Sequence, residues 1–177
     1  MTRLFVLLCA ALAVVLAGCA TPEGPATRLD KANILPLELD DDFQFRKILT
    51  SVFDPDLKEQ RVSSAKTGGV IDFERARRTW GAVGSLEVSK RHGSYFTFFW
   101  RTSRDSDVTL RLEYRQAGLG NYVMAQERYF PAARGSHRST FQVTGDEFLE
   151  NGLVSAWRAL LIVDGRVVAL RQSSMWR

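Results

Sequence analysis

Apolar and polar residues alternate without interruption over the eight positions from Val108 to Arg115. Alternation with a period of two turns one set of side chains to the core and the other to water, which is typical of a half-buried strand in an antiparallel sheet. Similar short runs, separated by turn residues, recur after residue 84. The pattern predicts seven strands, over residues 85–89, 95–102, 108–115, 122–130, 137–144, 153–163 and 166–176.

The last two strands are predicted to form a β-hairpin over residues 153–176. Asp164-Gly165 lies between two runs rich in Val, Ile, Leu and Trp, and this dipeptide accepts the positive φ values that a two-residue turn requires. The simplest register pairs Val163 with Arg166. One face of the hairpin is then apolar and belongs to the core, with Trp157, Ala159, Leu161 and Val163 packed against Val168 and Leu170.

The other face of the hairpin sets Arg158 opposite Arg171, beside apolar residues near the turn. Two like charges in opposite positions are unfavourable when they are buried, so this face is expected to be partly wet. A bulged turn would exchange the faces of the second strand, and the sequence is consistent with both arrangements.

Turn signals between the predicted strands are short and regularly spaced, and no long helix intervenes. This arrangement predicts a mainly β fold, an antiparallel seven-stranded β-sandwich, with a β-barrel as the alternative way to close the sheet. Residues 131–136 are predicted to be a loop. Residues 145–152 end in Asn151-Gly152 and predict one helical turn, a connection that carries the chain from one sheet to the other.

Residues 34–84 precede the predicted sandwich and carry mixed signals. Asp40-Asp41-Asp42 can cap a helix, and apolar residues recur at helical spacing as far as the Asp-Pro pair at residues 54–55. A short amphipathic helix is therefore predicted, within a segment that packs on the domain or leads into it. Residues 70–80 suit a strand and a helix equally well. The apolar positions of the predicted helix are Phe45, Ile48, Leu49, Val52 and Phe53.

Residues 1–18 have the form of an export signal. Arg3 precedes an uncharged apolar run, residues 4–16, which is too short to span a bilayer comfortably. The run ends in Leu-Ala-Gly-Cys, and these four residues resemble the lipobox of bacterial lipoproteins. The resemblance implies cleavage before Cys19 and acylation of that cysteine, and Ala20 at the next position implies an outer-membrane destination.

Acyl chains on Cys19 would anchor the protein to a membrane, because each buried methylene contributes about 0.8 kcal/mol and two chains suffice for stable anchoring. Residues 19–33 contain two prolines and a glycine without apolar periodicity, so they predict a lipidated tether. The remaining cysteine, Cys9, lies inside the signal. The mature chain is therefore expected to form no internal disulfide.

Trp100 stands where a fibronectin type III domain has its second-strand tryptophan. Leu149 or Leu153, together with Trp157, stand near the leucine and the later aromatic residue of that family. The strand order thus resembles immunoglobulin-like and fibronectin type III domains. This resemblance implies an immunoglobulin-like β-sandwich over residues 85–177.

Three stretches, taken together, also look like uncharacterised lipoproteins of Gram-negative bacteria. These stretches are residues 95–100 in the aromatic strand, residues 112–122 around a glycine-rich turn, and residues 156–165 in the C-terminal hairpin. The likeness agrees with the lipobox, and it implies no activity.

Signals for a metal site or for a histidine-based triad are missing from the sequence. His92 and His137 are the only histidines, and neither has a second His, Cys or carboxylate at ligand spacing. Asp105-Ser106-Asp107 lacks the remaining acidic positions and the glycine of a calcium loop, and it is expected to close a hairpin turn. We therefore expect no metal and no cofactor.

Glu147 and Glu150 are the carboxylates that could imitate the pair of a glycoside hydrolase. Such chemistry needs one carboxyl group in an apolar pocket and another kept ionised beside it, whereas these two lie on a predicted exposed helical turn. No glycine-rich phosphate loop, nucleophile elbow or redox cysteine pair accompanies them. A non-catalytic protein is expected, and a hydrolase is the least expected function.

Charge is distributed unevenly along the chain. Residues 70–177 contain sixteen Lys or Arg and eleven Asp or Glu, a balance of +5, whereas residues 20–69 contain seven and nine, a balance of −2. In an exported protein, the basic side could face anionic headgroups, acidic glycans or an acidic partner. Nucleic acid is not an expected partner of a protein exported to the cell envelope.

Four side chains are the candidates for contacts with a partner. Tyr95 and Phe99 lie opposite the core face of their strand, where they either pack under the N-terminal segment or form a platform for a sugar or a protein. Arg158 and Arg171 lie on the partly wet face of the hairpin. The sequence predicts a lipid-anchored module on the periplasmic side of the outer membrane that binds or assembles with an envelope protein. The alternative is a carbohydrate or cell-wall binding module.

Overall fold

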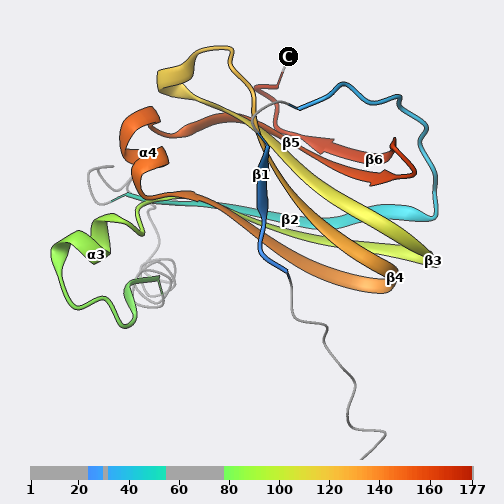
Figure 1. The fold of residues 1–177 in the computed structure, drawn as a ribbon, viewed down its shortest axis with the longest axis horizontal. Helices are drawn as coiled ribbons and strands as arrows, with labels where there is room; N and C mark the ends of the chain where they lie inside the picture. Colours follow the sequence, from blue (N-terminus) through green and yellow to red (C-terminus); the bar gives the residue numbers. More distant parts are fainter. Residues whose placement is uncertain (1–23, 30–31, 55–77, 177) are drawn as a thin grey trace, which may run out of the picture.

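The computed structural model describes residues 24–29, 32–54 and 78–176. The protein is mainly β, with an antiparallel six-stranded sheet in the order β1, β4, β3, β5, β6, and β2 also pairs with β3 (Figure 1). The strands are β1 (Thr27–Leu29), β2 (Phe43–Phe53), β3 (Gly93–Gln116), β4 (Met124–Thr144), β5 (Val154–Val163) and β6 (Arg166–Gln172). The described residues between these strands include α3 (Ser85–Ser89), the 3₁₀ turn η1 (Ala117–Leu119) and α4 (Asp146–Asn151).

β3 and β4 form one long antiparallel hairpin, whose pairing runs from Gly93 opposite Thr144 to Tyr114 opposite Met124. Register shifts interrupt this pairing in the middle, between residues 102 and 108 of β3. Bulges of this kind bend a strand and increase its twist. The hairpin therefore folds over on itself at this point.

Contacts between residues on either side of the bend show how far the hairpin folds over. The side-chain amide of Gln126 donates a hydrogen bond to the backbone carbonyl of Gln142 at 3.1 Å. In a straight strand these two residues would lie about 50 Å apart, at about 3.3 Å per residue. The rings of Trp100 and Phe130, on either side of the bend, also meet edge to face with their centroids 5.1 Å apart.

We name the two halves of the bent sheet after the strand that completes each. The β2 half contains β2, residues 93–102 of β3 and residues 135–144 of β4. The β5 half contains residues 108–116 of β3 and 124–130 of β4, together with β1, β5 and β6. Both halves turn apolar side chains toward one shared core, which includes Phe96, Phe98, Trp100, Val108, Leu110, Leu112, Tyr114, Phe141 and Leu161.

Aromatic contacts connect the two halves across this core. Trp157 on β5 packs edge to face against Phe96 and Phe98 of the β2 half, with ring centroids 6.0 and 5.9 Å apart. Phe98 is fully buried. Burial of a ring of this size contributes about 2–3 kcal/mol, so these contacts oppose unbending of the hairpin.

The predicted C-terminal hairpin and its turn are confirmed. Val163 pairs with Arg166, and Asp164 and Gly165 between them have φ values of 50° and 73°. The helical turn predicted over residues 145–152 is also confirmed as α4. It leads from the end of β4 in the β2 half to β5 in the other half.

The register of the hairpin differs from the simplest one, because a bulge follows the turn. Ile162 pairs with Val167 but Leu161 pairs with Ala169, so the faces of the second strand are exchanged beyond Val168. The predicted pairing of Arg158 with Arg171 is therefore wrong. Arg158 lies opposite Gln172, and Arg171 lies opposite Ala159.

The helix predicted after the three aspartates is wrong, because residues 43–53 form β2. β2 pairs with the first ten residues of β3, and Phe43 and Phe45 turn into the core. Two apolar residues of the helical pattern, Leu49 and Val52, remain 46% and 48% exposed. Pairing with a long neighbouring strand and burial of two phenylalanines outweigh the local periodicity.

The strand predicted over residues 85–89 is also wrong, since these residues form α3. The Glu87 carboxylate accepts a hydrogen bond from the Val83 N–H at 2.8 Å and supports the first turn of the helix. Leu86 is 68% exposed, so the alternation of Leu86 and Val88 does not mark a buried face.

The predicted count of seven strands is not confirmed. The strands expected over residues 95–102 and 108–115 are parts of β3, and those expected over 122–130 and 137–144 are parts of β4. The loop predicted over residues 131–136 is the bend of β4, where Ala132 and Gly135 adopt positive φ values of 44° and 79°. The bulged residues keep enough pairing for the ladder to continue through the bend.

An extended strap, residues 32–42, runs along the outer edge of β6. The Val167 N–H donates to the carbonyl of Pro36, and the Glu38 N–H donates to the carbonyl of Val167, both at 2.9 Å. Leu35 packs against Leu160, Ile162 and Val167 on the outer face of the β5 half. The strap thus covers a sheet edge that would otherwise expose its backbone groups.

Several predictions fall on residues that the structure does not describe. They concern the export signal, the lipidated Cys19 and nearly all of residues 70–80, of which residues 78 and 79 are helical.

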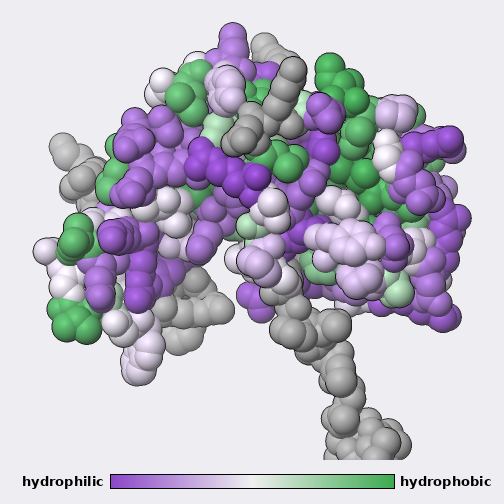
Figure 2. Space-filling model, viewed as in Figure 1, coloured by the Kyte–Doolittle hydropathy of each residue, from purple (hydrophilic) through white to green (hydrophobic). Residues whose placement is uncertain are grey.

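Among the described residues, no helix has both the length and the apolar character needed to cross a membrane. The molecular surface in the same view mixes polar and apolar residues, and apolar residues stand beside polar ones at the lower left, where α3 lies (Figure 2).

Candidate functional site

The outer face of the β2 half combines basic residues with an absence of acidic ones. The strand segments of residues 43–53, 93–102 and 135–144 contain no Asp or Glu. Alternate residues of β3 point away from the core on this face, and their neighbours on β2 and β4 do the same. The exposed basic residues of these segments are Arg46, Lys47, Arg101 and Arg138.

The charge of this face is available to a partner. Within the described part of the chain, Lys47, Arg101 and Arg138 form no ion pair. Lys47 and Arg138 flank Phe99 from the two neighbouring strands. Three cations, with no Asp or Glu in these described strand segments, create a positive potential that water does not fully screen over a few ångströms.

Tyr95 and Phe99 lie on this face, as their strand alternation predicts, and both are partly buried. The Arg78 guanidinium lies 3.9 Å from the centroid of the Tyr95 ring, and that of Arg138 lies 5.8 Å from the Phe99 ring. The Tyr95 hydroxyl donates to the backbone carbonyl of Arg91 at 2.5 Å. Partial burial raises the pKa of Tyr95 above its usual value. Each of the two rings thus has an arginine guanidinium group over its face, and neither is a bare aromatic platform.

The outer face of the β5 half also carries charges, but these charges neutralise one another. Glu113 is 1% exposed, and its carboxylate accepts a hydrogen bond from Arg158 at 2.5 Å and lies 3.5 Å from Arg111. Arg111 in turn pairs with Glu127 at 2.5 Å and donates to the Asn33 carbonyl of the strap at 3.0 Å. We call Arg111, Glu113, Glu127 and Arg158 the charge ladder, and their ion pairs connect neighbouring strands of the sheet.

Arg158 and Arg171 are not brought together with Tyr95 and Phe99. The Arg158 guanidinium is bound to Glu113 and also lies 4.8 Å from the ring centroid of Trp176, which covers it. Arg171 is exposed on β6 in the β5 half. The candidate residues therefore divide between the two halves of the sheet.

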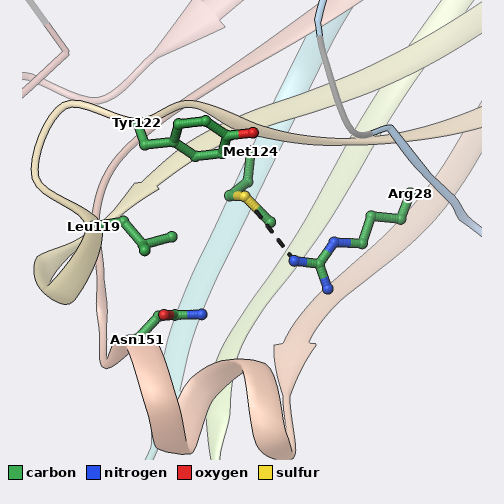
Figure 3. Close-up of a pocket in the computed structure, with 5 residues that line it drawn as sticks. All are labelled: Arg28, Leu119, Tyr122, Met124 and Asn151. Atoms are coloured by element: carbon green, nitrogen blue, oxygen red, sulfur yellow. Dashed lines mark hydrogen bonds between the residues drawn. The ribbon is translucent and has the colours of Figure 1, made fainter.

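A cleft of about 420 Å³ opens beside η1 and the end of α4 (Figure 3). Tyr122 and Met124 form one side of it, Leu119 and Asn151 approach from the turn and from α4, and Arg28 enters from β1. The Arg28 guanidinium lies 4.0 Å from the Met124 sulfur. The described residues that line the cleft include no carboxylate, so the cleft has no acid–base pair.

Glu147 lies next to the cleft in a polar cluster. It accepts a hydrogen bond from the Tyr114 hydroxyl at 2.5 Å and pairs with Arg28 at 3.3 Å. Burial, together with the hydrogen bond to Glu147, raises the pKa of Tyr114 far above its usual value. Glu150 is exposed on the same helix and does not join this cluster. The cluster ties α4 and β1 to the sheet, and the two carboxylates do not form a hydrolase pair.

The histidines lie against aromatic rings. His137 stacks on Trp100 with centroids 4.2 Å apart, and His92 meets the edge of Phe53 at 5.2 Å. Burial lowers the pKa of His137 below its usual value, so the neutral ring is favoured there. In the described ranges, His, Cys, Asp and Glu nowhere form a group of three that could hold a metal ion.

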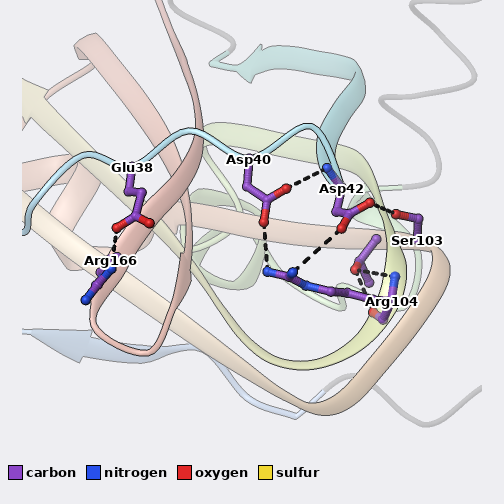
Figure 4. A network of polar contacts seen from close by, with 7 residues as sticks. Glu38, Asp40, Asp42, Ser103, Arg104 and Arg166 are labelled. Atoms are coloured by element: carbon purple, nitrogen blue, oxygen red, sulfur yellow. Dashed lines mark hydrogen bonds and ion pairs between the residues drawn. The ribbon is translucent and has the colours of Figure 1, made fainter.

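The aspartates that could suggest a cation site are occupied by protein groups (Figure 4). Arg104 donates to Asp40 at 2.7 Å and lies 3.7 Å from Asp42, whose carboxylate also accepts from Ser103. The same network fastens the strap and the start of β2 to the bend of β3. At the other side of the bend, Asp107 accepts from the Ala132 N–H at 2.8 Å, which lowers its pKa.

The chain matches no protein-family model, no curated protein and no solved structure. The residues themselves therefore define the candidate site. Sequence reasoning identified Tyr95 and Phe99 but missed Lys47, Arg101 and Arg138 beside them. The signal that could have found these three residues is the absence of Asp and Glu from the segments of the β2 half.

Proposed function

We propose that the protein is a lipid-anchored, non-catalytic binding module of the cell envelope, which holds an acidic partner protein on the outer face of its β2 half. The observation that carries this proposal is the acid-free set of strands, in which Lys47, Arg101 and Arg138 surround Phe99 and form no ion pair with the residues that the structure describes. Complementary charge favours encounter and orientation of an acidic partner, and the Phe99 ring supports the Arg138 guanidinium on this face.

A carbohydrate or cell-wall ligand is the second candidate, and the partly exposed aromatic pair of Tyr95 and Phe99 favours it. Sugars pack on exposed aromatic faces, but arginine guanidinium groups already lie over these two rings. A protein with surface carboxylates can instead pair with these arginines while they stay in place. The acidic protein partner is therefore the better fit.

The anchor in this proposal is an acylated Cys19, at the periplasmic side of the outer membrane. It is supported by the Leu-Ala-Gly-Cys sequence at the end of the apolar leader. Cys19→Ala should release or mislocalise the protein, as measured by fractionation of membranes and by the mass of the N-terminal peptide. Unchanged membrane retention with an unprocessed leader would count against lipidation.

An immunoglobulin-like β-sandwich is part of the same proposal as the class of the domain. The shared core between the β2 half and the β5 half supports it, since the two halves face each other as the layers of a sandwich do. An experimental structure in which the hairpin of β3 and β4 runs straight would exclude this class.

Site-specific photocrosslinking in intact cells tests the binding face. A photoreactive residue at Thr97, on the outer face between Tyr95 and Phe99, should trap one dominant envelope protein that mass spectrometry identifies. The same residue at Ser155, an exposed position on β5, is the matched control and should trap much less of it.

Charge reversal distinguishes the two candidate ligands. Arg101→Glu combined with Arg138→Glu should abolish crosslinking from Thr97 if the partner is an acidic protein. A glycan ligand would instead leave Thr97 without a protein adduct and would raise the melting temperature when cell-wall fragments are added. Equal adducts from Thr97 and Ser155 would show that the face is not specific and would refute the binding site.

A further inference from the structure

A ten-residue segment before β3 exposes three large apolar side chains. Trp80 is 84% exposed, Val83 is 93% exposed and Leu86 is 68% exposed. We call residues 80–89, which contain α3, the apolar knob. Single exposed apolar residues are common on protein surfaces, but three within seven positions of one projecting segment mark a contact surface. The knob projects at the lower left of the molecule (Figures 1 and 2).

Hydrogen bonds hold the neck of the knob, residues 78–80 and 91, so the exposed side chains lie on a fixed segment. One terminal nitrogen of Arg91 donates to the carbonyls of Arg78 and Trp80, at 2.8 and 2.6 Å. The Tyr95 hydroxyl binds the carbonyl of Arg91 and connects this neck to β3. A fixed apolar projection loses less conformational entropy on docking than a flexible one.

Among the described residues that flank the knob in the sequence, the charges are mainly positive. Arg78, Lys90 and Arg91 flank it, and Lys90 is exposed. Glu87, the one acidic residue between positions 78 and 91, accepts the Val83 N–H in the helix cap. Exposed apolar side chains beside a cation match the interface of an anionic bilayer, where Trp favours the headgroup level and each nearby cation contributes about 1 kcal/mol.

The length of chain before the described structure places a bilayer within reach. Four residues lie between Cys19 and Gly24, the first described residue, and the five steps from one to the other span at most about 18 Å in a fully extended chain. In the view of Figure 1, the chain enters at the lower side of the molecule, and α3 also lies toward that side. A domain held this close to a bilayer contacts it readily through a projecting segment.

We propose that the apolar knob docks into an anionic bilayer surface and thereby fixes the orientation of the domain on the membrane that carries its anchor. This inference rests on the lipid anchor of the proposed function, but it uses none of the residues of the binding face. Trp80, Val83 and Leu86 enter the interface, and the exposed Lys90 lies against the headgroups.

Trp80 reports on this docking directly. Of the four tryptophans, Trp100 and Trp176 are buried and Trp157 is partly buried, whereas Trp80 is largely exposed. The lipidated protein is reconstituted into phosphatidylcholine vesicles with and without 30% phosphatidylglycerol, each containing brominated acyl chains as quenchers. We expect stronger quenching of Trp fluorescence in the anionic vesicles, and Trp80→Phe should remove the quenched component.

Val83→Asp tests the depth of insertion, and Leu39→Asp is the matched control. Removal of one inserted apolar side chain should lower the ratio of docked to undocked protein about tenfold. Leu39 is as exposed as Leu86, at 66%, but it lies on the strap. Leu39→Asp should therefore leave the quenching unchanged.

Vesicle flotation separates failure of the anchor from failure of the knob. Protein that floats with both kinds of vesicle but shows no quenching of Trp80 retains its anchor and overturns the docking of the knob. Protein that floats with anionic vesicles alone lacks the anchor, yet supports the knob if Val83→Asp abolishes flotation. Protein that floats with neither overturns both.

Discussion

Glu113 is the carboxylate on which the charge ladder of the β5 half depends, and Glu113→Gln should destabilise the protein strongly. The substitution keeps the size of the side chain but removes the charge that faces Arg111 and Arg158. A buried cation that loses its partner keeps the cost of its desolvation. The effect is therefore expected on the free energy of unfolding rather than on binding.

The magnitude follows from how exposed the two arginines are. Breaking a fully buried pair costs about 3–5 kcal/mol. The Arg111 side chain is 9% exposed but keeps Glu127 as a partner, and the Arg158 side chain is 35% exposed and can turn partly to water. We therefore expect the lower end, about 3 kcal/mol, which corresponds to a fall in melting temperature of about 10 °C for a chain of this length.

Urea unfolding followed by tryptophan fluorescence measures this loss. Glu38→Gln is the control, because Glu38 pairs with Arg166 on the surface, where the two side chains are 63% and 57% exposed. An exposed pair contributes about 0–1 kcal/mol, so the control should change the free energy of unfolding very little. Equal losses for Glu113→Gln and Glu38→Gln would refute the assignment of Glu113 as a buried centre of the ladder.

Two further predictions concern the bent hairpin. Gly93→Ala should lower the free energy of unfolding by at least about 2 kcal/mol, because the new Cβ would lie 2.1 Å from the Val143 carbonyl oxygen. Gly135→Ala places its Cβ in open space and should lower the free energy of unfolding less in the same urea assay. Burial lowers the pKa of His137 in the folded protein, so protonation of this ring is favoured in the unfolded chain. Stability is therefore full above the unfolded pKa of about 6.5, and it falls as the pH drops toward the folded value. Melting temperatures between pH 8 and 5 should show a smaller fall for His137→Gln than for the native protein, and an identical fall would exclude His137 as the cause.

The strands could be predicted from the sequence where their burial pattern is local. The alternation after Val108 reports directly on Leu110 and Leu112, which are fully buried in β3. The bend could not be predicted, because a bulge changes the register by one residue without a distinct residue pattern. β2 was missed for a related reason: the partner that makes it a strand lies about fifty residues further along the chain.

The candidate site shows the same limit of local reasoning. Tyr95 and Phe99 were identified because their strand alternates regularly. Arg158 was placed opposite a second arginine within the hairpin, but its actual partner is Glu113 on β3. Neighbouring strands decide which charges are neutralised, and no spacing within one hairpin reveals them.

The binding face lies on the β2 half and the apolar knob adjoins that half, since α3 precedes β3 and Tyr95 joins the neck of the knob to the sheet. The outer face of the β5 half is unsuited to such roles, because the strap and Trp176 cover it and its charges are paired. The two proposals therefore predict separate effects from separate side chains. Arg101→Glu with Arg138→Glu should abolish the protein adduct at Thr97 and leave the quenching of Trp80 by brominated lipid intact. Loss of both signals would mean that the basic face itself lies on the bilayer, because only a shared membrane contact couples the two surfaces through charge.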